Sequence, residues 1–280
     1  MRSFVLLFLA GCGGGPGGGG PTLLQNKGSD TMVNLMQRMS EAYTASHPDT
    51  VIAVTGGGSG TGIKSLIDGT TDLANSSRKM KDEEVGLAKK NGKDPVETVI
   101  AFDGLAIYVN TANPVAALSF DDLRCIFGAD GACKKWSDLG VTLDCGGTDE
   151  IVKVGRQNNS GTYEYFHEEV LGKDGKFTNT MDQSGTQQVV DVVSTSTCAI
   201  GYGGMGYHNE KARFVCLAKT KEEPCVVPSL ETVKAHQYPF SRPLQVYTNG
   251  QPTGASKAFL DWALSEAGQK IVLEAGFVPK

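Results

Sequence analysis

Between residues 22 and 74, short continuous runs of apolar residues, typical of strands, alternate with apolar residues at helical spacing. Residues 22–27 predict a short strand, and helical spacing continues from there to His47-Pro48. The apolar positions of this helix are Met32, Leu35, Met36, Met39 and Tyr43. A buried strand, the opening of a helix and a third strand are then predicted at 51–54, 63–67 and 72–74. This alternation favours a parallel α/β sheet, in which ligands bind at the carboxyl ends of strands.

Later apolar segments predict that the chain passes twice between two domains. The extended run at 99–110 is long enough to cross from one domain to another, and 238–243 has the character of a return crossing before a strand at 244–247. A closing helix is expected at 256–275. Its inward face would consist of Phe259, Leu260, Trp262, Ala263 and Leu264.

These crossings give a cleft-forming layout with one discontinuous domain. Domain I is expected at 22–106 and 242–280, and domain II is inserted at 107–241. The chain of 280 residues is long enough for two domains with cores of their own.

The first 21 residues have the character of a processing signal. Arg2 precedes a short apolar run, and Leu9-Ala10-Gly11-Cys12 resembles a bacterial lipobox, whose cysteine carries lipid after cleavage. A lipoprotein signal peptide is therefore expected at 1–11, and the Gly/Pro-rich residues 12–21 would form a flexible tether. The apolar run is too short to span a bilayer, so lipid on Cys12 would hold the protein at a membrane surface. An unprocessed leader is the alternative.

Composition narrows the possible partners. The hydrophobic share of 40% and the charged share of 20% are ordinary for a globular protein. The net charge of −5 provides no basic surface for nucleic acid or for acidic lipids. An anion-binding site in this chain must therefore depend on local hydrogen-bond donors.

Six cysteines remain after Cys12, and an even number in an exported protein predicts disulfides. Six cysteines allow 15 connectivities. The short spacings favour Cys125–Cys133 and Cys216–Cys225, which leaves Cys145–Cys198. No metal site is predicted, because no C-x-x-C pair occurs and the four histidines are scattered.

Three Ser/Thr-Gly turns precede helix-like segments, at 28–31, 57–62 and 156–162. The first turn of a helix carries unpaired N–H donors and a partial positive charge, and Ser/Thr hydroxyls add donors. Arg78 and Arg156 lie beside these turns, and a guanidinium matches two oxygens of a phosphate. Each turn alone is more simply a helix cap. The three together predict a tetrahedral anion held from several sides.

The glycine-rich segment at 57–65 does not fit the common catalytic or nucleotide-binding motifs. The P-loop pattern fails because Ile63 stands where lysine is required, and the nucleophile elbow fails because Thr61 stands where the last glycine belongs. No cofactor and no enzymatic activity are predicted. A secreted serine hydrolase or phosphatase that uses Ser59 or Ser160 is the alternative of another class.

Segments in order along the chain from residue 22 resemble the PstS phosphate-binding proteins of bacterial ABC importers. These segments are 27–32, 55–63, 74–78, 101–106, 110–114, 124–127, 160–162, 199–202, 238–244, 268–270 and 276–279. The resemblance implies a type 2 periplasmic-binding-protein fold with two α/β domains and phosphate in the cleft. It further implies a lipid-anchored monomer, in the periplasm or on the outer cell surface, that delivers inorganic phosphate to an ABC permease of the inner membrane.

Carried over by position, the resemblance assigns the site to the same turns. Thr31 and Met32 would offer a hydroxyl and a backbone N–H, Ser59 its hydroxyl, and Arg156 with the 160–162 turn would hold the anion from domain II. The full candidate set is Ser29, Asp30, Thr31, Met32, Ser59, Gly60, Ser77, Arg78, Asp103, Arg156, Ser160, Gly161 and Thr162.

One position departs from part of the family. Some PstS branches have an aspartate where Ser77 stands, and that carboxylate accepts the proton of hydrogen phosphate and so rejects sulfate. Such branches also pair the arginine with an acid where this chain has Asn158. The nearest carboxylates here are Asp30 and Asp103, so another oxyanion such as sulfate or molybdate stays an alternative ligand.

Overall fold

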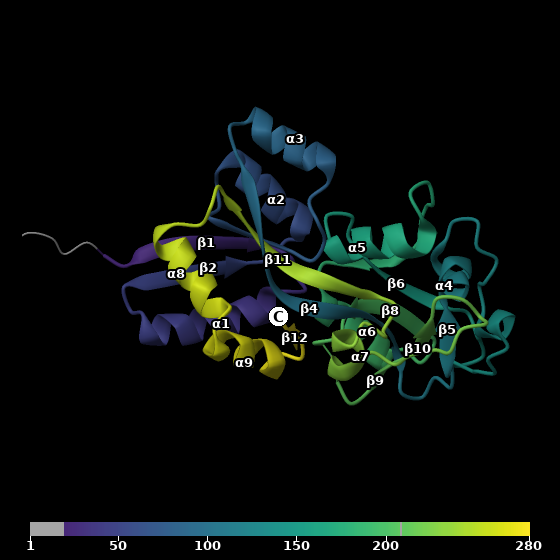
Figure 1. Cartoon of the computed structure of the whole chain (residues 1–280). Coiled ribbons are helices and arrows are strands. Elements are labelled where there is room, and N and C mark those ends of the chain that lie inside the picture. The colour runs from purple at the N-terminus through teal and green to yellow at the C-terminus, as the bar shows by residue number, and fades with distance from the viewer. Residues whose placement is uncertain (1–19, 208) are drawn as a thin grey trace, which may run out of the picture.

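The computed structural model describes residues 20–207 and 209–280. Within them, a long mixed sheet has helices on both sides (Figure 1). Its strands in spatial order are β2 (Thr50–Thr55), β1 (Thr22–Gly28), β3 (Leu73–Ser76), β11 (Ser241–Asn249), β4 (Pro95–Asn110), β8 (Ala199–Gly204), β6 (Val152–Arg156) and β7 (Met181–Gln183). Two further strands pair with β4, namely β12 (Val278–Pro279) and β9 (Ala212–Phe214). A separate parallel pair consists of β5 (Ala117–Ser119) and β10 (Cys216–Ala218).

Helices flank the sheet on both faces. α2 (Ser59–Asp68) and α3 (Asp82–Lys90) lie on one side of β1, β2 and β3, and α1 (Val33–Ser46), α8 (Gly254–Ala263) and α9 (Glu266–Glu274) lie on the other (Figure 1). The other helical segments are α4 (Phe120–Phe127), the 3₁₀ turn η1 (Trp136–Leu139), α5 (Gly161–Phe166), the π-helical turn η2 (His167–Leu171), α6 (Thr186–Thr195) and α7 (Leu230–Lys234).

The long strand β4 joins two parts of the sheet. Its first part pairs with β11, from Pro95 opposite Asn249 to Gly104 opposite Ser241, and its last part pairs with β8 from Leu105 onward. We call the strands on the β11 side, with the loops and helices attached to them, the first half-sheet, and those on the β8 side, with their loops and helices, the second half-sheet. The predicted extended run is thus present, and it is the element shared by both halves.

The direction of the strands follows from this path. β1, β2 and β3 are parallel, as the strand–helix alternation predicts for this part of the chain. β6, β7 and β8 are parallel as well. β11 is antiparallel to both β3 and β4. The sheet is therefore mixed, because the chain leaves the first half-sheet along β4 and returns along β11 in the opposite direction.

One hydrophobic core extends through both half-sheets. The predicted face of α1 is buried in it through Leu35, Met36, Met39 and Tyr43. The last part of β4 is buried along its whole length, from Leu105 to Asn110. A strand covered on both faces is expected to have such a continuous apolar run.

Two predicted helices have different bounds in the structure. α2 begins at Ser59, ahead of the predicted 63, because Gly57 and Gly58 have left-handed φ angles of 109° and 90° that end the loop there. The single closing helix predicted at 256–275 is wrong, since α8 ends at Ala263 and α9 begins at Glu266.

The break between α8 and α9 has a local cause. Ser265 caps α9, and its hydroxyl accepts a hydrogen bond from Gly268 N at 3.5 Å. Trp262 and Leu264, at the end of α8, are only partly buried, whereas Phe259, Leu260 and Ala263 are buried as predicted.

The three predicted disulfides are present. They join Cys125 to Cys133, Cys145 to Cys198 and Cys216 to Cys225. The second of these closes the longest stretch of chain, with a sequence separation of 53 residues. All three lie in the inserted part of the chain, and the Cys145–Cys198 bridge fastens the loop before β6 to the start of β8.

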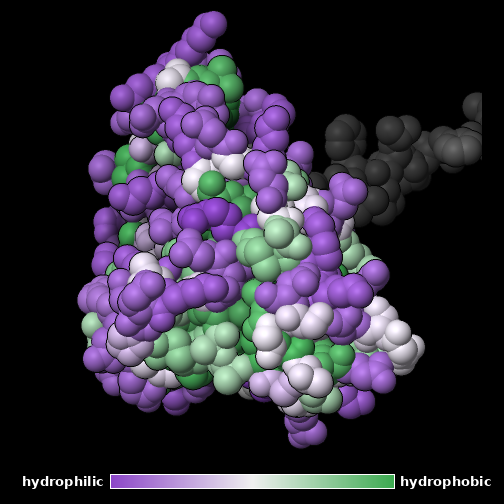
Figure 2. Space-filling view, turned by 90° about the vertical axis from the view of Figure 1, so that its right-hand side faces the viewer, coloured by the Kyte–Doolittle hydropathy of each residue, from purple (hydrophilic) through white to green (hydrophobic). Residues whose placement is uncertain are grey.

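The predicted signal peptide, Cys12 and most of the tether lie outside the described residues. Among the residues that are described, no helix has the length and apolar character needed to cross a membrane. Viewed from the side of α4 and β5, hydrophilic residues cover most of the surface, and apolar residues gather mainly in the lower half of the view (Figure 2).

Candidate functional site

Five buried hydroxyl side chains lie together where the two half-sheets meet. We call them the hydroxyl cluster, and they are Ser29, Thr31, Ser59, Ser77 and Thr162. Ser29 and Thr31 follow β1, Ser77 follows β3, Ser59 begins α2 and Thr162 lies in the first turn of α5. The cluster therefore forms at carboxyl ends of strands and at helix starts, where backbone donors are concentrated.

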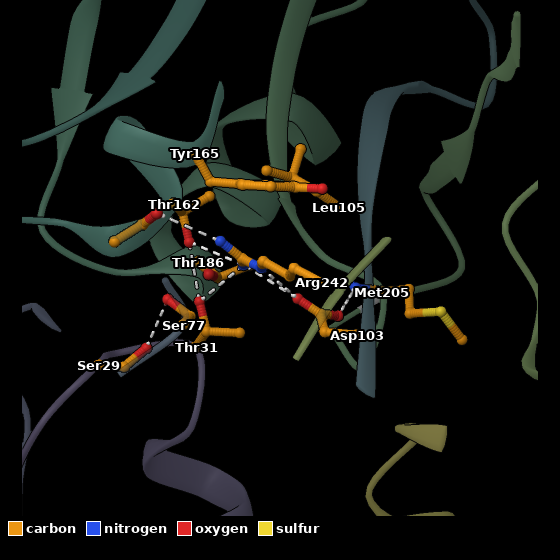
Figure 3. Close-up of polar contacts among 12 residues, drawn as sticks. Ser29, Thr31, Ser77, Asp103, Leu105, Thr162, Tyr165, Thr186, Met205 and Arg242 are labelled. Carbon is orange, nitrogen blue, oxygen red and sulfur yellow. Dashed lines mark hydrogen bonds and ion pairs between the residues drawn. The ribbon is translucent and has the colours of Figure 1, made fainter. Parts of the chain in front are cut away.

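Direct hydrogen bonds connect these hydroxyls. Ser29 Oγ donates to Ser77 Oγ at 2.9 Å, and Ser59 Oγ lies 3.3 Å from Ser77 Oγ. Thr31 Oγ1 and Thr162 Oγ1 are 2.9 Å apart, which joins the two half-sheets (Figure 3). Each hydroxyl can donate or accept, so the group can rearrange to offer several donors to one anion.

Glycine allows the close approach of the third turn to the first two. A methyl group on Gly161 would lie 2.7 Å from Ser77 Oγ and would also collide with Ser59 Oγ. The start of α5 thus rests directly against the cluster. The three turns that the sequence singled out are brought to one place.

Backbone and capping contacts occupy several other candidates. Ser160 is the N-cap of α5, and its hydroxyl accepts from Thr162 N at 3.1 Å. Met32 N donates to Ser29 O at 3.0 Å, and Gly60 N donates to Asn159 O at 3.0 Å. The helix-cap interpretation therefore describes Ser160 in this structure, while the hydroxyls of the cluster bond mainly to one another.

Arg242 and Asp103 form a fully buried ion pair beside the cluster. Arg242 Nε and Nη2 both donate to Asp103 Oδ2, at 3.1 and 2.9 Å. Nη2 also lies 3.0 Å from Thr162 Oγ1 and 3.4 Å from Thr31 Oγ1. Burial raises the pKa of Asp103, and Arg242 and the Met205 N–H oppose that rise.

Sequence reasoning missed Arg242 as a site residue. A usable signal was present, because Arg242 and Asp103 each interrupt a predicted crossing segment that is otherwise largely apolar. Their pairing depends on the register of β11 against β4, which places Arg242 opposite Asp103. That register follows from tertiary structure and cannot be read from either segment alone.

Arg156 is buried and reaches across the junction of the half-sheets. Its Nη2 lies 3.3 Å from Asp30 Oδ2, and its Nη1 donates to Thr186 Oγ1 at 3.1 Å. Its Nε is buried without a hydrogen-bond partner among the described residues. Burial lowers the pKa of Arg156, and Asp30 opposes that shift. Asp30 is also bonded by the Gly57 N–H at 2.8 Å.

Arg78 directs its guanidinium away from the cluster toward Glu84. Nη1 and Nη2 donate to the two carboxylate oxygens of Glu84 at 2.8 and 2.7 Å. Burial disfavours the charge on Arg78, but the hydrogen bonds and attraction of Glu84 outweigh it and raise the pKa of Arg78. The structure therefore does not bring Arg78 into contact with the hydroxyls.

Two further contacts join the half-sheets at the edge of the cluster. Asn159 Nδ2 donates to Gly57 O at 2.8 Å, which ties the third turn to the second. Lys81 Nζ lies 2.9 Å from Glu164 Oε2, and both residues line a groove of about 730 Å³. Arg242 also lines this groove.

Comparison with known proteins identifies the family. The PBP superfamily domain matches residues 15–267. The phosphate-binding protein PstS of Pseudomonas aeruginosa is 37% identical over 267 residues, which cover 91% of this chain and 82% of that protein. The structure from Clostridium perfringens described as a phosphate ABC transporter substrate-binding protein with bound phosphate has a TM-score of 0.80. It is 28% identical and covers 92% of this chain and 100% of its own.

A second solved structure has the same architecture. The ABC-type phosphate transport receptor of Vibrio cholerae has a TM-score of 0.70 and 26% identity, and it covers 92% of this chain and 100% of its own. The predicted type 2 periplasmic-binding-protein fold is thereby confirmed. This chain belongs to the PBP superfamily and, within it, to the family of PstS phosphate-binding proteins.

Proposed function

We propose that this protein is the substrate-binding protein of an ABC importer and that it captures inorganic phosphate. The observation that carries the proposal is the hydroxyl cluster, in which side chains from both half-sheets meet beside two buried arginines. Hydroxyl and guanidinium donors that converge from opposite sides suit a tetrahedral anion. The related proteins named above are phosphate-binding proteins of transporters.

The two half-sheets support a division into two domains with the predicted boundaries. We place domain I at 22–106 and 242–280 and domain II at 107–241. The exchange of partners along β4 between Gly104 and Leu105, and the start of β11 at Ser241, favour these limits. Phosphate would bind between the domains and close them by a hinge motion of the crossing strands.

The phosphate ligands in this proposal are the predicted residues together with their observed neighbours. The hydroxyls of Ser29, Thr31, Ser59, Ser77 and Thr162 would bind directly. Small rearrangements would free the N–H groups of Met32, Gly60 and Gly161 and the guanidinium of Arg156 for the anion. Asp30 would hold Arg156, Ser160 would hold the first turn of α5, and Asp103 would hold Arg242 beside the threonine hydroxyls. Arg78, which is bonded to Glu84, is given no role at the anion.

The cellular setting is also a proposal. Lipid on Cys12 would anchor the protein to a bacterial membrane, in the periplasm or on the outer surface, and the tether would let it reach an ABC permease as a monomer. Three disulfides favour an oxidising compartment outside the cytoplasm.

Competition binding tests the choice of ligand. In calorimetry near pH 7, phosphate should bind with one-to-one stoichiometry, and sulfate or molybdate at equal concentration should leave that binding almost unchanged. Displacement of phosphate by an equal concentration of sulfate would show that the protein is a receptor for another oxyanion.

A chromogenic phosphate ester separates the receptor from the hydrolase alternative. A binding protein should hold phosphate tightly and release no chromophore above the buffer rate. Turnover that disappears in Ser59→Ala or Ser160→Ala would instead assign the protein to the serine hydrolases or phosphatases.

A further inference from the structure

The Arg242–Asp103 pair lies on the two strands that connect the half-sheets. Arg242 is the second residue of β11 and stands opposite Asp103 of β4 in the antiparallel register. Both side chains are buried, with exposed fractions of 1% and 0%. A charge at this position is costly to bury unless it is paired and hydrogen-bonded, as it is here.

The guanidinium of Arg242 contacts both half-sheets at once. Nη2 donates toward Thr31 Oγ1 before α1 and toward Thr162 Oγ1 in α5, and Nη1 lies 3.4 Å from Gly161 O. Figure 3 shows the guanidinium between Asp103 on one side and Thr162 on the other. An anion oxygen bound by these two threonine hydroxyls would therefore also lie within reach of Arg242.

The orientation of Arg242 is fixed from several directions. Asp103 accepts from both Nε and Nη2, which holds the plane of the guanidinium. Tyr165 lies against that plane, with its ring centroid 5.5 Å from the guanidinium carbon, and its hydroxyl donates to Ser241 O at 2.6 Å. A group so constrained loses little further freedom when it binds a ligand.

We propose that Arg242 is a direct ligand of the bound anion, and that Asp103 positions Arg242 and offsets its charge. This inference rests on the proposed function and adds a second arginine to the site beside Arg156. Arg242 gives a charge-assisted hydrogen bond to the anion, which is stronger than its present bonds to neutral hydroxyls. Because Arg242 and Asp103 belong to the crossing strands, the contact also links the anion to the segment about which the domains would move.

A pair of opposite substitutions separates this role from a purely structural one. Arg242→Gln leaves the carboxylate of Asp103 facing the anion, so the phosphate dissociation constant should rise by at least about 30-fold. Asp103→Asn loosens the hold on Arg242 but also removes a negative charge beside the anion. These two effects oppose each other, so the dissociation constant should rise by less than about threefold. The double variant should bind more tightly than Arg242→Gln alone, because the repelling carboxylate is gone.

Control variants and thermal unfolding distinguish a loss of phosphate binding from a loss of the fold. Arg213→Gln removes an arginine of β9 that bonds to the carbonyls of Asn113 and Val115, and it should leave phosphate affinity unchanged. Thermal unfolding identifies variants that do not fold. If Arg242→Gln does not fold, the comparison is made between Arg242→Lys and Asp103→Asn. The lysine variant is expected to lose much more phosphate affinity than the asparagine variant.

Three outcomes would overturn the inference or its premise. Wild-type affinity in folded Arg242→Gln would exclude Arg242 as a ligand. Equal losses in folded Arg242→Gln and Asp103→Asn, or in Arg242→Lys and Asp103→Asn, would show that the pair is only structural. Failure of the wild-type protein to bind phosphate would instead refute the proposed function, whatever the variants do.

Discussion

Gly161, the first residue of α5, lies directly against the hydroxyl cluster. Its Cα lies so near Ser59 and Ser77 that any side chain would push α5 away from them. The position needs a small residue because of this contact alone, since Gly161 does not have a left-handed φ angle. Close packing against Ser59 and Ser77, and not backbone flexibility, explains the glycine.

Gly161→Ala should weaken phosphate binding at least tenfold, which corresponds to about 1.4 kcal/mol of binding free energy. The added methyl would separate Thr162 from Thr31 by displacing the first turn of α5. Calorimetry measures the affinity and thermal unfolding monitors the fold. Gly86→Ala is the matched control, because a methyl in that part of α3 meets no atom within 4 Å and should leave affinity unchanged. Unaltered binding by Gly161→Ala would contradict the close-packed site.

Single residues also show how far the sequence could predict the site. The three Ser/Thr-Gly turns were identified because helix starts have a recognisable local chemistry, and the structure brings them together. Asn159 and Arg242 were missed as site residues because their roles arise from contacts with distant segments, such as Gly57 O and Asp103. Local patterns do not contain those contacts.

At the scale of elements, the disulfide Cys145–Cys198 restrains the longest loop among the three bridges. A cross-link stabilises a fold mainly by restricting the unfolded chain, and the effect grows with the length of the closed loop. The separations of 53 and 9 residues for Cys145–Cys198 and Cys216–Cys225 therefore predict unequal contributions.

Removing Cys145–Cys198 by paired alanine substitutions should lower the free energy of unfolding by about 4 kcal/mol. The same change at Cys216–Cys225 should lower it by about 2.5 kcal/mol. Urea denaturation of the two double variants under oxidising conditions provides the comparison. Equal losses, or a larger loss for Cys216–Cys225, would show that strain or residual structure outweighs loop length.

The start of α3 depends on the ion pair of Arg78 and Glu84. Burial works against the carboxylate, but hydrogen bonds from Arg78 and Lys81 N outweigh it and lower the pKa of Glu84 below its ordinary value of 4.5. A carboxyl with a lowered pKa stabilises the fold above its ordinary pKa, and this contribution is lost as the pH falls through the folded-state value.

Glu84→Gln should therefore reduce the free energy of unfolding by about 2 kcal/mol near neutral pH. The difference from wild type should shrink as the pH falls below 4.5 and through the lowered folded-state pKa of Glu84, where the wild-type carboxylate also takes up a proton. Denaturation curves across this pH range test the claim, with the exposed Glu83→Gln as control. If the free energies of unfolding of wild type and Glu84→Gln differ by the same amount at all pH values, the charge on Glu84 does not stabilise α3.

Helices were predicted correctly where a helical spacing of apolar residues extends over many positions. The prediction failed where a capping residue begins a new helix within such a pattern. The face of α1 is buried as its spacing predicts. The closing helix was wrong because apolar spacing continues through Ser265, although Ser265 starts a new helix. Period alone cannot distinguish one long helix from two short ones joined at a cap.

At the scale of the whole molecule, the half-sheets touch directly as well as through the proposed anion site. Asn159 donates a hydrogen bond to Gly57 O, and Lys81 forms an ion pair with Glu164 at the groove. These contacts involve no hydroxyl of the cluster. They should stabilise the closed arrangement whether or not the anion is bound.

Asn159→Ala should raise the phosphate dissociation constant by about three- to tenfold, mainly through faster dissociation. The variant loses the side-chain bond to Gly57 O but keeps the backbone bond from Gly60 N. Stopped-flow release of phosphate measures the rate, and small-angle scattering reports the shift toward the open form. Asn91→Ala, at the exposed end of α3, should behave as wild type. An unchanged dissociation rate would show that this contact does not hold the domains closed.

The pairing of arginines with carboxylates also has a kinetic consequence. Arg78, Arg156 and Arg242 are each matched by one acid, and the whole chain carries a net charge of −5. The protein thus has no surplus positive field to draw phosphate from a distance. The association rate should change by less than about threefold between about 0.01 and 0.5 M ionic strength, because there is little attraction for salt to screen. A receptor built in this way would bind its ligand at nearly the same rate in fresh water and in salt water.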